Sequence, residues 1–432
     1  MKLIKLIILS IVCVCIANAQ QTPAEVQSKA VAIVGGTAHL GNNSIIQNSL
    51  IIFENGILQT VSEYNKTEDL SKMEVIDTKD QHIYPGFIVA NSTLGLIEID
   101  AVRATDDDEE LGNWNPHIRS LIAYNAESRV VESMRPNGVL LAQISPRGGR
   151  ISGTSSIVQL DAWNWEDAVI KADDGIHLNW PSTFSRGRWW LGEDPGLKSN
   201  PKYSSQTSEI EAYFNNAKAN SNNAKAKLNL PLNAMRGLFD QSKTLYIHVN
   251  DEKGIVDAVE FSNSQGLSKS VIVGGYEAFK VANYLKENAI SVLLNRVHSS
   301  PNHDDQDYDL PYKMAYLLVE AGVTVGLETS GDMERMNSRN LPFYAGTTVA
   351  HGLSKEQALQ LITLNTAKIL GIDSHYGSLE VGKSATLFIS SGDALDMRTN
   401  NLTNAFIDGR NISLESHQTK LWKRYSKKYE KN

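Results

Sequence analysis

The sequence predicts an α/β protein that combines a barrel with a small β domain. Strand-like runs alternate with helical patterns through residues 85–375, as in Leu245 to Val249 followed by Ile255 to Ser264. Such alternation over about 250 residues is typical of parallel strands wound into a barrel, with reactive groups at the carboxyl ends of the strands. Both chain ends carry short β-branched runs separated by turn residues, and we expect them to pair into one β domain.

The β domain is expected to consist of residues 24–84 and 376–425. In the first part, Val31 to Val34 precedes Gly35-Gly36, and Ser49 to Phe53 precedes Glu54-Asn55-Gly56. This spacing indicates antiparallel hairpins. Similar runs return at 385–389 and 405–410.

Within the barrel region, 85–375, further strands are expected at 270–273 and 323–327. A helix is expected from Ser354 to Leu370, because Ser354 is a suitable N-cap, Gln357 lies three residues later and Gly371 ends the pattern. The polar tract 199–227 interrupts the alternation and is expected to be a surface excursion or a flexible insert.

The first 19 residues have the three parts of a secretory signal peptide. Lys2 and Lys5 precede an apolar run from Leu6 to Ile16, and Ala17-Asn18-Ala19 precedes the expected cleavage point. We therefore expect export to the periplasm or the extracellular space. Both cysteines of the chain, Cys13 and Cys15, lie inside this segment, so the exported chain would have no thiol for a disulfide or a thiolate metal site.

Charge and hydropathy argue against nucleic acid as a partner and against a membrane-spanning segment. Removal of the signal, with its two lysines, leaves 39 basic and 49 acidic residues, which makes nucleic acid an unexpected partner. No later stretch approaches the roughly 20 apolar residues of a membrane helix. We expect no membrane anchor.

Three tracts carry a resemblance to a known family. Residues 84–95 read Tyr-Pro-Gly-Phe-Ile-Val-Ala-Asn-Ser-Thr-Leu-Gly, residues 358–371 read Ala-Leu-Gln-Leu-Ile-Thr-Leu-Asn-Thr-Ala-Lys-Ile-Leu-Gly, and residues 377–387 read Gly-Ser-Leu-Glu-Val-Gly-Lys-Ser-Ala-Thr-Leu. Over nearly the whole mature length, the chain resembles the imidazolonepropionase-like branch of the amidohydrolase superfamily. The resemblance implies a distorted (β/α)8 TIM-type barrel flanked by a small β-sandwich.

The resemblance also implies a metal-dependent hydrolase of non-peptide C–N bonds, acting on cyclic amides or peptide-like substrates. A divalent metal such as zinc would lower the pKa of a bound water and polarise the scissile carbonyl, while a strand-end aspartate moves protons. The first barrel strand of the family ends in His-x-His. In this chain those two positions are Asn91 and Thr93, whose side chains bind zinc far more weakly than imidazole.

Other ligand positions implied by the resemblance are mostly substituted as well. His248 matches the strand-five histidine, although a buried structural histidine explains it equally well. The next strand ends in glycine at 274–275, and the last strand has Ser330 near the expected aspartate. Glu328 or Asp332 could substitute for that aspartate if the backbone bulges. Asp332 is the candidate catalytic acid or base, although a solvated loop acid explains it with fewer assumptions.

Three loops offer candidate substrate-binding residues. His298 and His303 follow a barrel strand and have carboxylates nearby, although an acidic surface loop explains them with fewer assumptions. The loop 146–154 lacks the Gly-Lys-Ser/Thr ending of a phosphate loop, and we expect a tight turn with Arg147 or Arg150 facing a ligand carboxylate. Glu98 lies in the first loop above the barrel.

Five of the seven tryptophans fall between residues 163 and 190. This density predicts either a pocket wall or subunit interface, or the small core of an insertion.

These observations favour an exported superfamily member with a reduced or absent metal centre, acting as a weak hydrolase or as a silent partner of an active homologue. One alternative is an active hydrolase with a non-standard ligand set, holding one zinc or another divalent metal. The other is a non-catalytic barrel that binds a small amide or peptide-like ligand. Homo-oligomers and hetero-oligomers with an active homologue are both compatible with the sequence.

Overall fold

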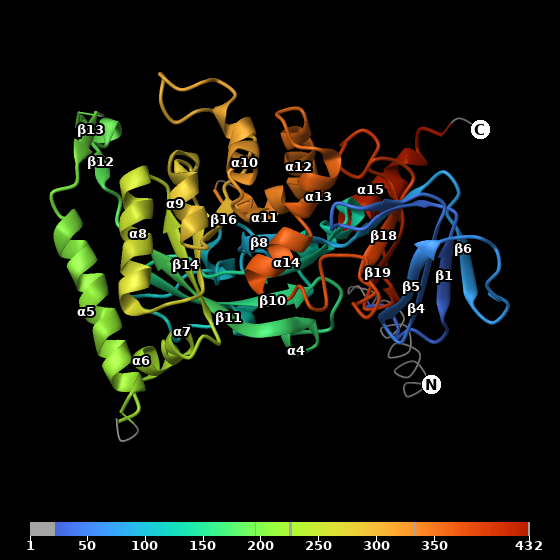
Figure 1. The fold of residues 1–432 in the computed structure, drawn as a ribbon, viewed down its shortest axis with the longest axis horizontal. Coiled ribbons are helices and arrows are strands. Elements are labelled where there is room, and N and C mark those ends of the chain that lie inside the picture. Colours follow the sequence, from blue (N-terminus) through green and yellow to red (C-terminus); the bar gives the residue numbers. More distant parts are fainter. Residues whose placement is uncertain (1–21, 195, 224–226, 332, 431–432) are drawn as a thin grey trace, which may run out of the picture.

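The computed structural model describes residues 22–194, 196–223, 227–331 and 333–430, and it confirms the expected barrel with flanking sheets (Figure 1). The predicted signal peptide lies outside these residues. The barrel sheet has eight strands in the order β17-β16-β15-β14-β11-β10-β9-β8. Its strands are β8 (Phe87–Ser92), β9 (Val139–Ile144), β10 (Ile151–Gln159), β11 (Val169–Asn179), β14 (Thr244–Val249), β15 (Ser270–Gly274), β16 (Ser291–Leu294) and β17 (Val325–Leu327). A parallel bridge between Ala90 and Glu328 connects the two edge strands.

One strand breaks the parallel pattern that the sequence predicted. β10 pairs antiparallel with both β9 and β11, whereas the other strands pair in parallel. Only residues 145–150 join β9 to β10. A parallel connection needs a crossover of a dozen or more residues, so this short link forces a reversal. Gly148 and Gly149 make the turn with φ of +77° and +61°. The reversal places the 145–150 loop at the carboxyl end of the barrel.

Helices cover the outside of the barrel (Figure 1). Those that follow β14 are α8 (Glu252–Gln265), α9 (Ala282–Glu287), α10 (Leu310–Glu320), α11 (Glu334–Asn337), α12 (Leu341–Val349), α13 (Lys355–Gln360) and α14 (Leu364–Leu370). Those that precede it are α2 (Ser120–Ala123), α3 (Arg129–Glu132), α4 (Trp165–Ala168), α5 (Tyr203–Ser221), α6 (Leu230–Ala234) and α7 (Arg236–Phe239).

The helix predicted from Ser354 to Leu370 is two helices, α13 and α14. Its predicted ends are correct, because Ser354 and Gln357 form a capping box and Gly371 caps α14 with φ of +65°. The interruption lies at 361–363. There the carbonyl of Ile362 accepts a hydrogen bond from the backbone of Ile88, and the carbonyl of Leu361 accepts one from Leu327. Contacts with the barrel strands thus replace helical hydrogen bonds, which local sequence cannot reveal.

The polar tract 199–227, expected to be a surface excursion or a flexible insert, contains the regular helix α5. α5 buries Ile210, Phe214 and Ala217, and Phe214 packs edge to face on Phe261 of α8, with ring centroids 4.9 Å apart. A two-stranded hairpin, β12 (Phe184–Arg186) and β13 (Leu197–Ser199), precedes it. The apolar positions are spaced widely in a polar background, which hid the helix in the sequence.

Both chain ends contribute to the flanking sheets, at the right of Figure 1. One sheet has the order β5-β4-β1-β6 and the other β20-β19-β18-β7-β2-β3. Their strands are β1 (Val31–Val34), β2 (Thr37–His39), β3 (Ile45–Ile46), β4 (Ser49–Glu54), β5 (Ile57–Glu63), β6 (Glu74–Asp77), β7 (His82–Pro85), β18 (Leu387–Ser390), β19 (Leu402–Ile407) and β20 (Arg410–Asn411). Phe53 packs edge to face on Phe406, so the core joins the two ends. The limits 24–84, 85–375 and 376–425 stay predictions.

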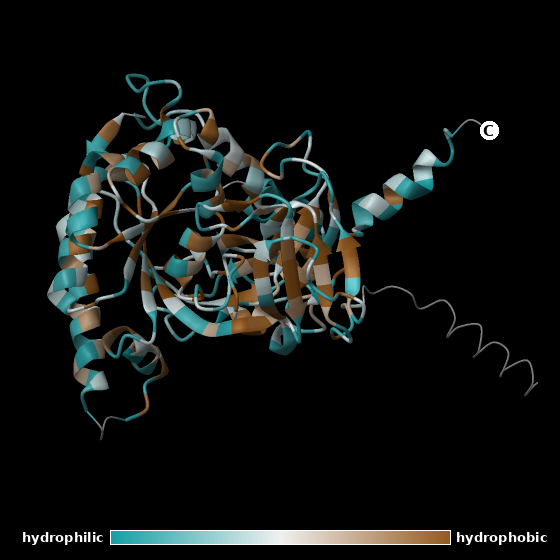
Figure 2. Cartoon of the chain, turned by 45° about the vertical axis from the view of Figure 1, so that its right-hand side comes forward, coloured by the Kyte–Doolittle hydropathy of each residue, from teal (hydrophilic) through white to brown (hydrophobic). Residues whose placement is uncertain are grey.

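After β20 the chain ends in helix α15 (His417–Ser426), which projects from the body (Figure 2). Among the described residues, no helix combines the length and the apolar character that a membrane crossing requires.

Candidate active site

The carboxyl end of β8 carries the two positions where a His-x-His pair was expected. Asn91 is 1% exposed and has φ of +49°, a left-handed conformation that asparagine tolerates better than most residues. Its backbone N–H donates to the side-chain oxygen of Gln143 on β9. Thr93 is fully buried, and its hydroxyl has no hydrogen-bond partner among the described residues.

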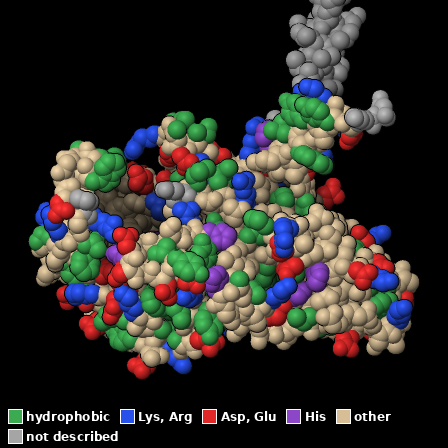
Figure 3. Space-filling model, turned by 90° about the horizontal axis from the view of Figure 1, so that it is seen from above, with side chains coloured by type: hydrophobic (Ala, Val, Ile, Leu, Met, Phe, Trp, Pro, Cys, Tyr) green, Lys and Arg blue, Asp and Glu red, His purple; other side chains and the backbone are tan. Residues whose placement is uncertain are grey.

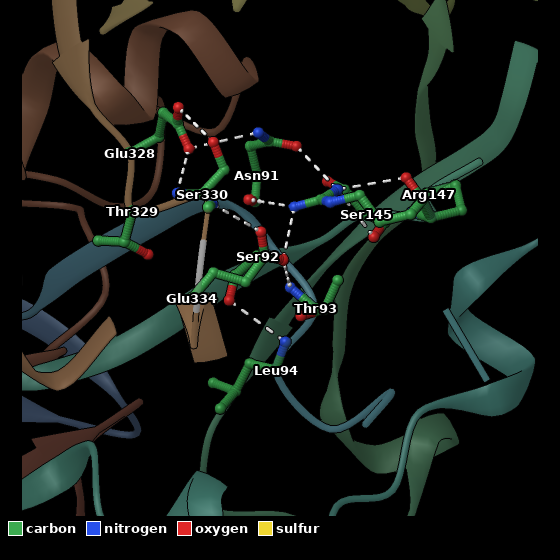
Figure 4. A network of polar contacts seen from close by, with 12 residues as sticks. Asn91, Ser92, Thr93, Leu94, Ser145, Arg147, Glu328, Thr329, Ser330 and Glu334 are labelled. Carbon is green, nitrogen blue, oxygen red and sulfur yellow. Dashed lines mark hydrogen bonds and ion pairs between the residues drawn. The ribbon is translucent and has the colours of Figure 1, made fainter. Parts of the chain in front are cut away.

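The guanidinium of Arg147 fills the space beside Asn91 (Figure 4). It donates to the Asn91 side-chain oxygen at 3.1 Å and to the Asn91 carbonyl at 2.8 Å. It also forms an ion pair at 2.8 Å with Glu334 of α11, and the same carboxylate accepts from the backbone N–H of Thr93. The Arg147 side chain is only 22% exposed. A fixed positive charge therefore lies at the mouth of the barrel.

Glu328, directly after β17, faces this group from the opposite edge strand. Its carboxylate accepts from the backbone N–H and the hydroxyl of Ser330, at 2.6 and 2.7 Å, and lies 3.4 Å from the Asn91 side-chain nitrogen. Burial raises the pKa of Glu328 to about 7. The carboxylate that faces the mouth thus belongs to Glu328, two residues before Ser330.

Two histidines form a pair deeper in the same mouth. The Nε2 atom of His248, on β14, lies 2.8 Å from the Nδ1 atom of His177, on β11. Burial, followed by the charge of Arg147, lowers the pKa of His248 to about 3, and burial lowers the pKa of His177 well below its usual value. Both imidazoles are therefore neutral at physiological pH. Sequence analysis missed His177, although its position near the end of a buried strand resembles that of His248.

Below the pair, a buried carboxylate ties four strands together. Asp174 accepts hydrogen bonds at 2.8 Å each from Tyr246, Ser155 and Gln143. Burial raises the pKa of Asp174. The Tyr246 ring stacks on His177 with centroids 4.8 Å apart. This hydrogen-bond network stabilises the interior of the barrel beneath its mouth.

Comparison with solved structures establishes the fold. An amidohydrolase from Thermotoga maritima superposes with a TM-score of 0.75 at 22% identity, covering 88% of this chain and 99% of that chain. An adenosine deaminase from Xanthomonas campestris with bound zinc gives a TM-score of 0.52 at 13% identity, covering 92% and 97%.

Sequence comparison adds a direct match, because residues 313–412 fit the model of the Amidohydrolase family. This match and the shared fold relate the chain to the amidohydrolase superfamily. Within it, 82 residues are 38% identical to an imidazolonepropionase of Syntrophobacter fumaroxidans, covering 19% of each chain. A second imidazolonepropionase, from Flavobacterium psychrophilum, is 29% identical over 110 residues, covering 24% of this chain and 27% of its own. These matches span only about a fifth to a quarter of the relatives' length.

Amidohydrolase-superfamily proteins typically bind a divalent metal, and the residues at this mouth do not fit one. Among the described residues, no group of three or more His, Cys, Asp or Glu side chains is placed to hold a metal ion. Asn91 and Thr93 supply neutral oxygens, and Gly274 at the end of β15 supplies no side chain. Arg147 adds a positive charge that repels a cation. The residues at the mouth therefore support no metal-dependent step.

The other predicted site residues lie in several places. Asp332 is outside the described residues. Glu98 accepts from Asn125 and Ser128, which fastens the loop before α3, and Arg150 donates to the carbonyl of Asn179 at the end of β11. The structure places Asn91, Thr93 and His248 at the mouth of the barrel. Glu98 instead stabilises the loop before α3.

The two histidines of the 298–303 loop diverge. His298 bonds to Thr347 of α12 at 2.6 Å. His303 instead lines a cavity of about 340 Å³ between the β12–β13 hairpin and the strand ends, together with Phe184, Asn250 and Tyr276. Seen from above, the surface of the protein is hollowed at the left of Figure 3.

The five clustered tryptophans also separate in space. Trp180 is buried against Phe261, whereas Trp163 is exposed and Trp189 and Trp190 lie exposed beyond β12. They form neither a single pocket wall nor a single core.

Removing the Tyr246 hydroxyl tests how much the hydrogen-bond network of Asp174 contributes to stability. Because Tyr246→Phe leaves Asp174 with one donor fewer, we expect the free energy of unfolding in urea to fall by about 1 to 2 kcal/mol. Tyr124→Phe is the matched control, since the buried Tyr124 hydroxyl has no hydrogen-bond partner within the described part of the chain. Equal losses in the two variants would contradict the role of the Asp174 network.

Proposed function

We propose that this amidohydrolase-superfamily protein has given up metal-dependent hydrolysis and acts as a catalytically silent partner of an active homologue. The observation that carries the proposal is the Arg147 guanidinium, bonded to Asn91 where the first metal ligand would stand. A cation at that place would meet a fixed like charge and an amide in place of imidazole. We propose that the partnership operates outside the cytoplasm, after removal of the signal peptide.

The remaining groups of the mouth support the same proposal. Glu328 is engaged by Ser330, and Glu334 is engaged by Arg147, so neither carboxylate is left open toward a metal-bound water. The Nε2 atom of His248 is hydrogen-bonded to the Nδ1 atom of His177. The two carboxylates and His248 thus each have a protein partner, whereas the Thr93 hydroxyl and the Nε2 atom of His177 have none among the described residues.

The proposal is tested by elemental analysis of the mature chain, combined with assays on cyclic amides and dipeptides. We expect much less than one zinc per chain and no hydrolysis above background. About one tightly bound zinc per chain, with turnover that His248→Ala abolishes, would contradict the proposal and favour the active hydrolase. Copurification with a related chain that carries an intact His-x-His would support the partnership.

A second candidate is a binding barrel without catalysis, which the cavity beside the β12–β13 hairpin favours. Its volume of about 340 Å³ suits a small amide or peptide-like ligand, and its wall combines Phe184 and Leu197 with the amides Asn250 and Asn302. Ligand binding that Phe184→Ala weakens, in protein without metal or turnover, would favour this candidate.

A further inference from the structure

The terminal helix α15 has an unusual division of its surface. At 100° per residue, Leu421, Trp422 and Tyr425 fall within an arc of about 100°, while Lys420, Lys423 and Arg424 fall within a similar arc on the opposite side. None of the ten side chains of α15 is buried, and Trp422 is 70% exposed and Tyr425 56% exposed. The apolar stripe of Leu421, Trp422 and Tyr425 is therefore not packed against any other part of the described chain.

The turn that follows α15 continues both surfaces. Lys427 and Lys428 extend the basic side, and Tyr429, which is 75% exposed, extends the aromatic side. Residues 416–430 contain five Lys or Arg residues and a single acid, Glu430, in a chain with a formal net charge of −8. The projecting element, whose position Figure 2 shows, thus carries a local excess of positive charge.

We propose that α15 is an amphipathic helix that binds the surface of an anionic lipid bilayer. Helices that lie in a membrane interface carry Lys and Arg on the polar face and Trp or Leu on the other, and Trp and Tyr rings suit the headgroup level. The pattern of α15 has both properties. At about 15 Å, the helix lies on a bilayer and does not cross it.

Charge composition favours a lipid surface over a protein partner. Four of the five cations in this segment are lysines, and lysine is depleted in protein interfaces, where arginine is enriched. Anionic headgroups attract each Lys or Arg near the surface. The rest of the chain is acidic and would be held away from such a membrane by the projection of α15.

The base of the helix is fixed to the barrel, which orients it. Ser416 and Thr419 form a capping box, and the backbone N–H of His417 donates to Glu132 of α3. The aromatic stripe can therefore meet a flat surface without unfolding of the body.

Cosedimentation of the full mature protein with vesicles tests the proposal. Vesicles of phosphatidylcholine with about one third phosphatidylglycerol are compared with pure phosphatidylcholine, at about 0.1 M salt. We expect binding to the anionic vesicles, at least about tenfold weaker in Lys423→Glu plus Lys427→Glu and also weakened by Trp422→Ser plus Tyr425→Ser. Raising the salt to about 0.5 M should release the wild-type protein.

The matched control is Lys66→Glu plus Lys72→Glu, which makes the same charge change at exposed positions between β5 and β6. We expect it to bind as the wild type does. Absence of wild-type binding, equal binding to both vesicles, or equal losses in the control would overturn the proposal. Dimers that the Trp422→Ser plus Tyr425→Ser variant dissociates, in protein that ignores vesicles, would instead show docking between chains.

Discussion

Replacing Asn91 and Thr93 by histidine and Arg147 by alanine is expected to create a zinc site at the mouth of the barrel. The three changes add two imidazoles at the end of β8 and remove the guanidinium that bonds to Asn91. His248 and the Glu328 carboxylate then complete a set of nitrogen and oxygen ligands of the kind that zinc prefers. After incubation with zinc and desalting, elemental analysis should find about one zinc per chain in the variant and much less in the natural protein.

A variant with glutamine at positions 91 and 93 and alanine at 147 serves as the control. It also removes the guanidinium but adds no imidazole, so it should stay without tightly bound zinc. If the histidine variant folds and binds no more zinc than this control, the Arg147 cluster is not the feature that separates this mouth from a metal centre. Arg147→Ala alone should raise the pKa of His248, which histidine resonances in an NMR titration would report.

Replacing Glu328 by glutamine is expected to stabilise the protein at neutral pH and to have little effect in acid. The buried carboxyl has a pKa of about 7, against 4.5 for an ordinary glutamate. The folded state therefore holds a proton that the unfolded state releases, and stability falls as the pH rises from about 4.5 to about 7. The shift corresponds to about 3 kcal/mol, which Glu328→Gln should recover above pH 7.

The difference between the two proteins is the quantity to measure, because His248 acts with the opposite sign. Its lowered pKa means that the unfolded state binds more protons in acid, so stability is lost as the pH falls below 6.5. Both proteins share that loss, and it cancels in the difference. Urea unfolding at pH 4 to 8 should give a difference that grows with pH. The Glu287→Gln variant, which changes an exposed carboxylate on α9, provides the baseline. A stability difference for Glu328→Gln that does not change with pH would contradict the raised pKa of Glu328.

Features governed by neighbouring residues were predictable. The capping box of Ser354 and Gln357 and the stop at Gly371 depend on backbone groups within a few residues, and both are present. A tight turn was expected within 146–154, and Gly148 and Gly149 form one there. The interruption of the helix at 361–363 was not, because its cause is hydrogen bonding to β8 and to the end of β17, far away in sequence.

The candidate site divides in the same way. Asn91 and Thr93, at the strand end where the resemblance implies His-x-His, are visible in the sequence, as are His248 and Glu328. Sequence analysis could not bring Arg147 to Asn91, because that contact depends on the reversal of β10. It also could not identify His177 or Asp174, whose importance lies in contacts with His248 and Tyr246.

The sequence by itself determined the barrel fold and the presence of Asn91 and Thr93 at the end of its first strand, since strand ends and caps are local properties of the chain. Only the tertiary structure decided what lies beside Asn91, because a guanidinium, an amide and two carboxylates from distant segments meet there. Electrostatic energy depends on distances between charges, and the distances between segments are set by the closing of the barrel.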